Sequence, residues 1–365
     1  MTPDLVRKYA KAVPRYTSYP TAPHFRAGFG AARAGQWLEA LPAQSRLSLY
    51  FHVPFCRSLC WFCGCHTKVT SRAAPLARYL DTLLAEVALV TARLGRGRPV
   101  AHIHFGGGSP SLLSPDEMKR LAEALHRSFA ILPGAEFAIE IDPRNIDEGR
   151  ARALAEIGVN RASLGVQDFD PAVQRAVNRV QPLELTARVA GLLRGNGIAR
   201  LNLDLMYGLP LQTIGGFVET VERALALAPD RFALFGYAHV PWMKKHQSLI
   251  DAAALPDAWQ RWCQARAAER RLAAAGYAAI GLDHFARPED PLARAAAAGT
   301  LRRNFQGYTA DPADALIGFG ASAIGALPQG YLQNESDLKA YAEAVAAGRP
   351  ATAGVCWRSP FSTSR

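Results

Sequence analysis

A cluster of cysteines is the strongest chemical signal in the sequence. Cys56, Cys60 and Cys63 are spaced Cys-x3-Cys-x2-Cys, and Cys65 follows two residues later. Three thiolates at this spacing can bind three irons of a cubane 4Fe-4S cluster, which leaves the fourth iron free to chelate a ligand. The segment therefore predicts an iron-sulfur cluster with one open coordination position.

A structural zinc site is the alternative interpretation of the same segment, with Cys65, His66 or His52 as the fourth ligand, because zinc accepts the same donors. We favour the cluster, since a site with one free metal position needs three protein ligands and not four. Cys263 and Cys356 stand alone, so the six cysteines do not form a disulfide framework.

The elements that position this cluster alternate between strands and helices. Short apolar segments with strand character are each followed by a helical stretch, and Ser114 with Glu117 gives one helix a capping-box start. Gly158, Gly195 and Gly197 stand where helix C-caps are expected. Such regular alternation predicts βαβ crossovers and a parallel sheet, either open and doubly wound or part of a barrel. The expected strands cover residues 47–53, 101–106, 136–142, 161–167, 200–207 and 231–238, and the expected helices cover 74–94, 115–129, 148–157, 182–194, 214–227, 256–275 and 336–347.

Polar residues and glycines fall at the carboxyl ends of these strands, which is where α/β barrels build their sites. Taken one at a time, a glycine cluster after a strand is often a turn, and two barrel carboxylates often form salt bridges. A shared edge of the sheet indicates a common site instead. We expect this site to contain the cysteine loop, residues 106–108, Glu140, Gln167, Asp204, Tyr237 and Ala238.

Composition excludes several classes of protein. The 365 residues are 49% hydrophobic and 20% charged, which is typical of a soluble globular protein with two structural parts. No apolar run approaches the roughly 18 residues of a membrane span, and the N-terminus lacks an apolar signal segment, so we expect a cytoplasmic protein with no membrane partner. The net charge of +11 comes mostly from arginines scattered among acidic residues, so we expect no nucleic-acid partner. Arginines serve a substrate with several carboxylates equally well.

Taken together, the motifs resemble those of the oxygen-independent coproporphyrinogen III oxidases, a family of radical S-adenosylmethionine enzymes. The resemblance runs from about residue 5 to about residue 350 and implies an α/β fold, a partial (β/α)6 TIM-like barrel with an N-terminal arm and a C-terminal extension. It is carried by PRYTSYPT (14–21), YFHVPFC (50–56), GGGSP (106–110), EIDPR (140–144), GVQDF (165–169), VNR (177–179), DLMYGLP (204–210), YAH (237–239), DHFARP (283–288) and RNFQGY (303–308).

The resemblance implies roles for individual residues. Cys56, Cys60 and Cys63 match the cluster ligands, whereas Cys65 matters for activity in the family without binding the cluster, and we expect catalytic roles for Cys65 and Tyr50. Ser109 stands where the family commonly has Thr, which keeps the hydroxyl. The residues expected around a first S-adenosylmethionine are Tyr50, Phe62, Gly107, Gly108, Ser109, Glu140 and Ile324, and those expected around a second are Gln167, Arg179, Asp204 and Ala238.

The reaction that the resemblance implies begins when the reduced cluster splits S-adenosylmethionine into methionine and a 5'-deoxyadenosyl radical. The radical abstracts a hydrogen from a propionate of coproporphyrinogen III, and loss of carbon dioxide and one electron leaves a vinyl group. Two such steps give protoporphyrinogen IX in haem biosynthesis. We expect a monomer that receives electrons from a flavodoxin-type or ferredoxin-type protein. The candidates for binding the substrate carboxylates are Arg15, Tyr16, His284, Arg287 and Arg303.

Four parts of the chain are expected: an N-terminal arm (1–45), a barrel core (46–240), an extension that begins a C-terminal region (241–350) and a divergent tail (351–365). In the tail, ATAGVCWRSPFSTSR loses helical periodicity and the resemblance ends. Members of the family continue into a C-terminal helical domain, most of which we expect this chain to lack. Because a lid excludes solvent and completes a site, we expect the cluster and S-adenosylmethionine to bind but decarboxylation to be impaired.

Three rival functions are open at this point. A non-catalytic haem-binding chaperone of the same superfamily shares the barrel and the three cysteines, but Cys65 and residues 15–21 resemble the oxidase. A zinc-stabilised basic protein acting on RNA is the second rival, and another radical enzyme with a different substrate is the third. The sequence indicates the type of reaction more firmly than the substrate.

Overall fold

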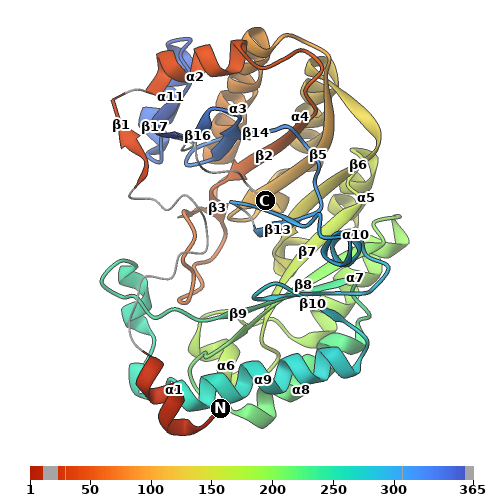
Figure 1. The fold of residues 1–365 in the computed structure, drawn as a ribbon, viewed down its shortest axis with the longest axis vertical. Coiled ribbons are helices and arrows are strands. Elements are labelled where there is room, and N and C mark those ends of the chain that lie inside the picture. The colour runs from red at the N-terminus through yellow and green to blue at the C-terminus, as the bar shows by residue number, and fades with distance from the viewer. Residues whose placement is uncertain (11–23, 29, 306, 358–365) are drawn as a thin grey trace.

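One curved sheet runs through the computed structural model, which describes residues 1–10, 24–28, 30–305 and 307–357 (Figure 1). The six expected strands lie side by side in chain order, and each neighbouring pair is parallel. The predicted α/β fold with a partial (β/α)6 barrel is therefore confirmed. These strands are β2 (Leu47–Val53), β5 (Arg98–Gly107), β6 (Phe129–Ile141), β7 (Arg161–Gln167), β8 (Arg200–Tyr207) and β9 (Arg231–Gly236).

Helices join the parallel strands and pack on the outer side of the sheet (Figure 1). The helix that begins at Pro115 has the predicted capping box, in which Ser114 N donates to the Glu117 carboxylate at 2.8 Å and Glu117 N donates to Ser114 Oγ at 3.3 Å. Gly195 is the last helical residue of its helix and not the cap that the sequence predicted. The connecting helices are α3 (Ala73–Leu94), α4 (Pro115–Ser128), α5 (Glu148–Glu156), α6 (Pro171–Ala176), α7 (Leu183–Gly195) and α8 (Ile214–Ala226), and α9 (Ala258–Ala274) lies beside α8.

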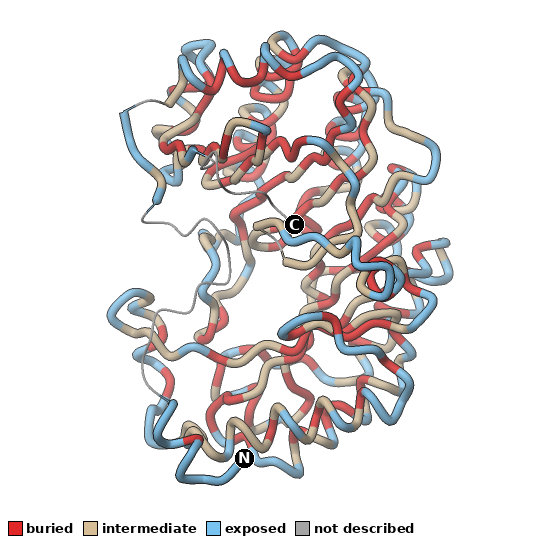
Figure 2. The backbone as a smooth tube through the Cα atoms, in the orientation of Figure 1, coloured by how far each residue is buried: buried red, intermediate tan, exposed pale blue. Residues whose placement is uncertain are grey.

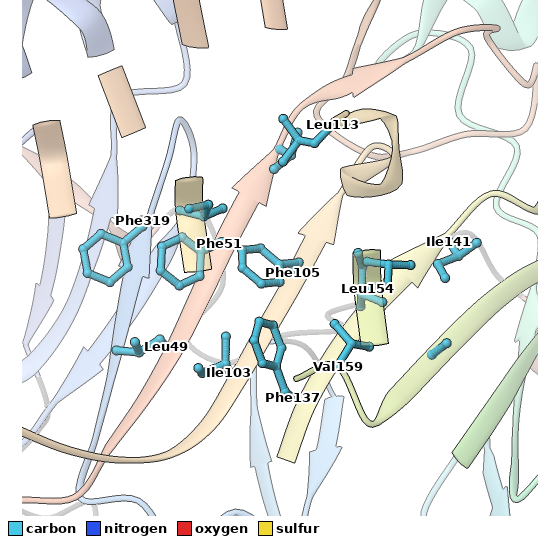
Figure 3. Close-up of a cluster of buried hydrophobic side chains, with 14 of the residues drawn as sticks. Leu49, Phe51, Ile103, Phe105, Leu113, Phe137, Ile141, Leu154, Val159 and Phe319 are labelled. Carbon is cyan, nitrogen blue, oxygen red and sulfur yellow. The ribbon is translucent and has the colours of Figure 1, made fainter. Parts of the chain in front are cut away.

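A row of aromatic rings ties neighbouring strands together on the face that meets the helices (Figure 3). Ring centroids lie 4.8 Å apart for Phe319 and Phe51, 5.0 Å for Phe51 and Phe105, and 5.3 Å for Phe105 and Phe137. All four side chains are buried, and removing one such ring typically costs about 3–5 kcal/mol. The row therefore fixes the relative position of four strands, one of which the sequence analysis did not expect.

The sheet extends beyond the six expected strands at both edges. Only helices were predicted after residue 241, because strands this short carry a weak periodic signal. Residues 352–357, which we expected in a divergent tail, form a strand between two others. The added strands are β14 (Ala315–Phe319), parallel to β2, followed by antiparallel β15 (Ile324–Leu327), β16 (Gly330–Asn334), β17 (Thr352–Trp357) and β1 (Arg26–Ala27), and at the other edge antiparallel β11 (His284–Ala286) and β10 (Ala278–Ile280).

Burial follows this arrangement, with the strands and the inward sides of the helices buried and the outer turns exposed (Figure 2). Among the described residues, none of the helices is both long and apolar enough to cross a membrane. The remaining elements are α1 (Pro3–Tyr9), which lies against α9, α2 (Gly30–Glu39), α10 (Pro291–Ala297), α11 (Leu338–Ala346), and the two small ladders β3 (Phe55–Cys56) with β4 (Lys68–Val69) and β12 (Arg302–Asn304) with β13 (Gly307–Thr309).

A buried carboxylate joins the later strands to the core. Glu86 of α3 is 2% exposed and accepts hydrogen bonds from Gly320 N at 2.7 Å, Asn334 Nδ2 at 2.6 Å and Tyr341 OH at 2.8 Å. Burial raises the pKa of Glu86 to about 7, although the three hydrogen bonds oppose this rise. One side chain thus connects α3 with three separate segments of the C-terminal third of the chain.

The stability of the protein should depend on pH through Glu86. The folded-state pKa of Glu86, about 7, lies above the ordinary value of 4.5. The contribution of Glu86 to the free energy of unfolding is therefore fully present below pH 4.5 and is lost as the pH rises through 7. Relative to Glu86→Gln, which does not titrate, the wild-type free energy of unfolding should fall by on the order of 3 kcal/mol across this window. Urea denaturation at a series of pH values measures it.

The exposed Glu343→Gln on α11 is the matched control and should follow the wild type within about 0.5 kcal/mol. A difference between wild type and Glu86→Gln that stays constant with pH would show that Glu86 does not titrate in this range.

Candidate cluster and cofactor site

The cysteine loop leaves the sheet at the carboxyl end of β2. Cys56 lies in β3, whose pairing with β4 closes the loop at its base, and Thr70 N donates to Cys56 O at 2.9 Å. Within the loop, Cys63 N donates to Cys60 O at 3.1 Å, so a tight turn brings the last two predicted ligands together. The three thiols therefore come from one short segment that is closed at both ends.

Segments from elsewhere in the chain hold the middle of this loop. Trp61 N donates to Val177 O at 3.0 Å, and Asn178 Nδ2 donates to Leu59 O at 2.8 Å. On the other side, the stretch before Ile250 supplies three further contacts to loop carbonyl groups. These are Lys244 Nζ to Cys65 O at 3.2 Å, His246 Nε2 to Cys63 O at 2.8 Å and Gln247 Nε2 to Phe62 O at 3.1 Å.

The thiols have unequal environments. A hydrogen bond from Cys65 lowers the pKa of Cys63 to about 6, whereas burial raises the pKa of Cys56 to about 12, with the neighbouring thiolates adding to the rise. The same hydrogen bond to Cys63 raises the pKa of Cys65. Cys63 is thus favoured as a thiolate relative to Cys56 and Cys65.

The donor set fits a cubane better than a single ion. Among the described residues, no three His, Cys, Asp or Glu side chains surround one ion position, as a zinc site requires. A cubane takes one thiolate on each of three separate irons, and Cys56, Cys60 and Cys63 offer three thiols from one closed loop. The three thiols thus remain the predicted ligands of a 4Fe-4S cluster.

A cavity of about 500 Å³, lined by both polar and apolar residues, opens on the concave side of the sheet next to this loop. Successive residues of a strand face opposite sides of the sheet. Apolar side chains of β2, β5 and β6 are therefore buried between the sheet and the helices, whereas polar side chains of these strands point toward the cavity. The residues lining the cavity include Cys65, His102, His104, Glu136, Glu140, Arg161, Ser163, Asn202, Asp204, Arg231, Phe235, His284, Asn304 and Tyr308.

Glu140 is held at the cavity wall by two donors. Gly107 N lies 3.0 Å from its Oε2, and His104 Nε2 lies 3.2 Å from its Oε1. Burial opposes its ionisation, yet the His104 contact and the Gly107 hydrogen bond together lower the pKa of Glu140. Its neighbour Tyr50 has a pKa well above the ordinary value, because the phenol is buried and lies near this negative charge. Glu140 is therefore an ionised acceptor at the cavity.

Asp204 faces the same cavity from β8. Ser163 Oγ donates to its oxygens at 3.1 and 3.2 Å, and Asn202 Nδ2 donates at 2.7 Å. Burial first, and the charge of Glu140 second, raise the pKa of Asp204 to about 6. Glu140 thus pairs with His104 across β6 and β5, as the salt-bridge alternative expected for it, whereas Asp204 is held by the neutral donors Ser163 and Asn202.

The glycines before Ser109 are required by their protein neighbours. A Cβ on Gly107, which has φ of +111°, would lie 2.7 Å from the His52 ring, and a Cβ on Gly108 would lie 2.6 Å from Phe55 O. Ser109 N donates to Phe55 O at 2.7 Å, and its hydroxyl meets Ser111 Oγ at 3.2 Å in the interior. The glycines therefore let the chain pass close to β2 and β3 beneath the cysteine loop.

Other predicted residues are placed around this cavity and not in its wall. The Phe62 ring packs into a small apolar cluster with Cys60 and Tyr237, and Arg179 contacts Cys60 and Gly165 O. Gln167 ends β7 with φ of +70°, and Asp204 lies three residues before the end of β8 and not at its end. The predicted residues outside the cavity wall are Tyr50, Phe62, Gly107, Gly108, Ser109, Gln167, Arg179, Ala238 and Ile324.

The candidates for substrate carboxylates divide into three groups. His284 lines the cavity, with Nδ1 2.8 Å from Asp283 Oδ1. Arg287 instead donates to Pro229 O at 3.1 Å and lies over the Tyr277 ring, and the exposed Arg303 lies over the Tyr308 ring. Both guanidinium groups therefore have structural contacts. Arg15 and Tyr16 fall outside the described residues.

The inward-facing residues of the strands were not predicted from the sequence. His102 and His104 alternate with Ile103 and Phe105 on β5, a period-two signal that was present in AHIHFG. At the far end of the cavity, Arg161 pairs with Glu136 at 2.9 Å and Asp290 at 3.2 Å, and Arg231 pairs with Asp290 at 2.7 Å. These pairs join β6, β7, β9 and the loop before α10, which no local pattern predicts.

Known proteins that match this chain include a protein family and two enzymes of the same name. A family model described as the radical SAM superfamily matches residues 50–224. The oxygen-independent coproporphyrinogen III oxidase of Bradyrhizobium diazoefficiens is 54% identical over 354 residues, which cover 97% of this chain and 79% of the relative. The enzyme of that name from Paracoccus denitrificans is 50% identical, with coverage of 93% and 75%.

A solved structure agrees with these relatives. Coproporphyrinogen III oxidase (HemN) from Escherichia coli, described as a radical SAM enzyme, superimposes with a TM-score of 0.91 at 40% identity, covering 97% of this chain and 80% of that one. Because these relatives carry the oxidase name, nothing in the comparisons favours the haem-chaperone alternative.

Iron binding should distinguish the three predicted ligands from Cys65. Replacing Cys56, Cys60 or Cys63 by Ala should each remove most of the bound iron after anaerobic reconstitution, because a cube held by two thiolates loses an anchoring iron site. Cys65→Ala should keep the iron content of the wild type, and Cys263→Ala is the control for loss of an unrelated thiol. Iron and sulfide analysis measures the outcome, and loss of the cluster in Cys65→Ala would make Cys65 a ligand.

Gly107→Ala should lower the stability of the protein by more than its unfavourable backbone conformation alone would. Gly134 also has positive φ, of +78°, but a Cβ there meets nothing within 4 Å. Gly134→Ala should cost only about 1 kcal/mol of stability, whereas Gly107→Ala should cost about 1–3 kcal/mol more through overpacking against His52. Urea denaturation of both variants measures the difference, and equal losses would show that the His52 ring moves aside freely.

Proposed function

We propose a reaction for this chain from one premise, that it belongs to the oxygen-independent coproporphyrinogen III oxidase family of radical SAM enzymes. The chain would convert two propionate side chains of coproporphyrinogen III to vinyl groups and so form protoporphyrinogen IX. The observation that carries this proposal is the closed loop of three thiols, with Cys65 facing a cavity of about 500 Å³. A cavity of this size that combines apolar and charged side chains suits a tetrapyrrole with carboxylate side chains.

When bound, the cluster and S-adenosylmethionine supply a carbon radical that takes a hydrogen atom from the substrate. Cys56, Cys60 and Cys63 would hold the cluster. The first S-adenosylmethionine would lie among Tyr50, Phe62, Gly107, Gly108, Ser109, Glu140 and Ile324. Glu140 supports this best, since it is an ionised acceptor fixed by Gly107 N and His104.

A second S-adenosylmethionine would lie near Gln167, Arg179, Asp204 and Ala238. Asp204 supports this assignment, because its carboxylate faces the cavity and is oriented by Ser163 and Asn202. Of the three described candidates for a substrate carboxylate, His284, Arg287 and Arg303, only His284 lines the cavity.

Hydrogen bonds also link the cysteine loop to β2. Tyr50 OH lies 2.9 Å from His52 Nδ1, and His52 Nε2 lies 3.1 Å from His66 O, so a hydrogen-bonded chain crosses from β2 to the end of the cysteine loop. We propose that these hydrogen bonds keep the cysteine loop in place over the cavity, with Cys65 and Tyr50 as the catalytic residues.

A small flavodoxin-type or ferredoxin-type protein would supply the electrons to the protein, which we propose to be a monomer.

The deciding experiment is anaerobic reconstitution with iron and sulfide, followed by addition of S-adenosylmethionine and dithionite, with and without coproporphyrinogen III. We expect broad cluster absorption, 5'-deoxyadenosine, and carbon dioxide release only when the porphyrinogen is present. Asp204→Asn should lower carbon dioxide release at least tenfold while it leaves the iron content unchanged, because Asp204 is not a cluster ligand.

The alternatives give different results in the same assay. Haem binding without 5'-deoxyadenosine would favour a chaperone, and zinc without cluster absorption would favour a zinc protein. Formation of 5'-deoxyadenosine with no carbon dioxide from coproporphyrinogen III would favour a radical enzyme with another substrate.

A further inference from the structure

Two arginines reach the sulfur of Cys60 from different loops. Arg144 Nη2 lies 3.5 Å from Cys60 Sγ, and Arg179 Nη1 lies 3.4 Å from the same atom. Arg144 belongs to the short turn after β6, and Arg179 follows α6 by three residues. Both distances are within the range of N–H···S hydrogen bonds, so this predicted cluster ligand has two cationic donors at its sulfur.

Asp142 holds these arginines in place. Arg144 forks onto it, with Nε 2.9 Å from Oδ1 and Nη2 2.6 Å from Oδ2, and Arg179 Nη1 lies 3.5 Å from Oδ2. The side chains of Asp142, Arg144 and Arg179 are 12%, 19% and 9% exposed. Burial disfavours a charged Asp142, but the charge of Arg179 and the hydrogen bonds from Arg144 lower the pKa of Asp142. The three residues therefore carry one net positive charge beside Cys60.

We propose that this arginine pair raises the reduction potential of the cluster through Cys60, and that Asp142 limits the rise. This inference rests on the cluster of the proposed function. Reduction adds one negative charge to the cluster, and N–H···S hydrogen bonds and nearby positive charge stabilise that charge in the sparsely hydrated interior. Asp142 has the opposite sign, so its own charge works against reduction while its geometry aims Arg144 at the sulfur.

This arrangement also gives Asp142 and Arg144 a role. Both belong to the motif EIDPR (140–144), in which the proposed binding of S-adenosylmethionine uses only Glu140. Neither Asp142 nor Arg144 lines the cavity, so both act as positioning residues through Cys60 and not as catalytic residues.

The test is a redox titration of the reconstituted protein, without substrate, followed by electron paramagnetic resonance of the reduced cluster. Arg144→Gln removes one donor and one positive charge, and should lower the ratio of reduced to oxidised cluster about tenfold at a fixed potential, which is 59 mV for a one-electron couple. Asp142→Asn removes the opposing negative charge and should shift the potential in the opposite direction.

A purely structural role would not produce potential shifts of opposite sign in the two variants. General loosening of the loop would shift both potentials in the same direction, or both variants would lose their iron. The matched control is Arg150→Gln, which breaks an Arg–Asp pair with Asp147 at 2.6 Å, also with a 19% exposed arginine side chain, at the start of α5. This variant should keep the wild-type potential.

Shifts of the same sign in Arg144→Gln and Asp142→Asn, or wild-type potentials in both with full iron content, would overturn the proposal. If Arg144→Gln fails to retain iron, Asp142→Asn decides alone, and a potential at or below that of the wild type overturns it. Failure of the wild type to bind any cluster would refute the proposed function instead.

Discussion

A loop that carries three thiols is useful only if something else holds its shape, because thiols close enough to share a cluster repel one another once ionised. Here the barrel supplies that support. Val177 and Asn178 hold the middle of the loop from one side, and His246 with Gln247 holds its second half from the other. The geometry of the cysteine loop therefore depends on the segments around Val177 and before Ile250 as well as on the loop's own sequence.

The strands separate two chemical environments a few ångströms apart. Outward residues such as Phe51 and Phe105 form the aromatic row under the helices, while His104, next to Phe105 along β5, faces the cavity. Charge inside the barrel is tolerated because it is paired or hydrogen-bonded: Glu140 has two donors, and Arg161 lies between two carboxylates. The described cavity carboxylates Glu140 and Asp204 each accept hydrogen bonds from fixed donors.

The C-terminal third of the described chain supports the same site from outside. Tyr79 OH donates to His52 O at 2.7 Å and accepts from Ala321 N at 2.9 Å. A single phenol thus links the residue that packs on Gly107 with the turn after β14, next to the Glu86 network. Strands that the sequence analysis treated as a loose extension therefore brace the strand from which the cysteine loop emerges.

Local patterns in the sequence determined the cysteine spacing, the capping box at Ser114 and the three strands 47–53, 161–167 and 200–207, because each depends on residues that are neighbours along the chain. They also placed Glu140 and Asp204 on one cavity, since parallel strands align their ends. Only the tertiary structure decided that Phe62 packs into an apolar cluster, that Arg144 and Arg179 meet at Cys60, and that residues 315–357 extend the sheet. These outcomes depend on contacts between residues tens to hundreds of positions apart, which no short period in the sequence encodes.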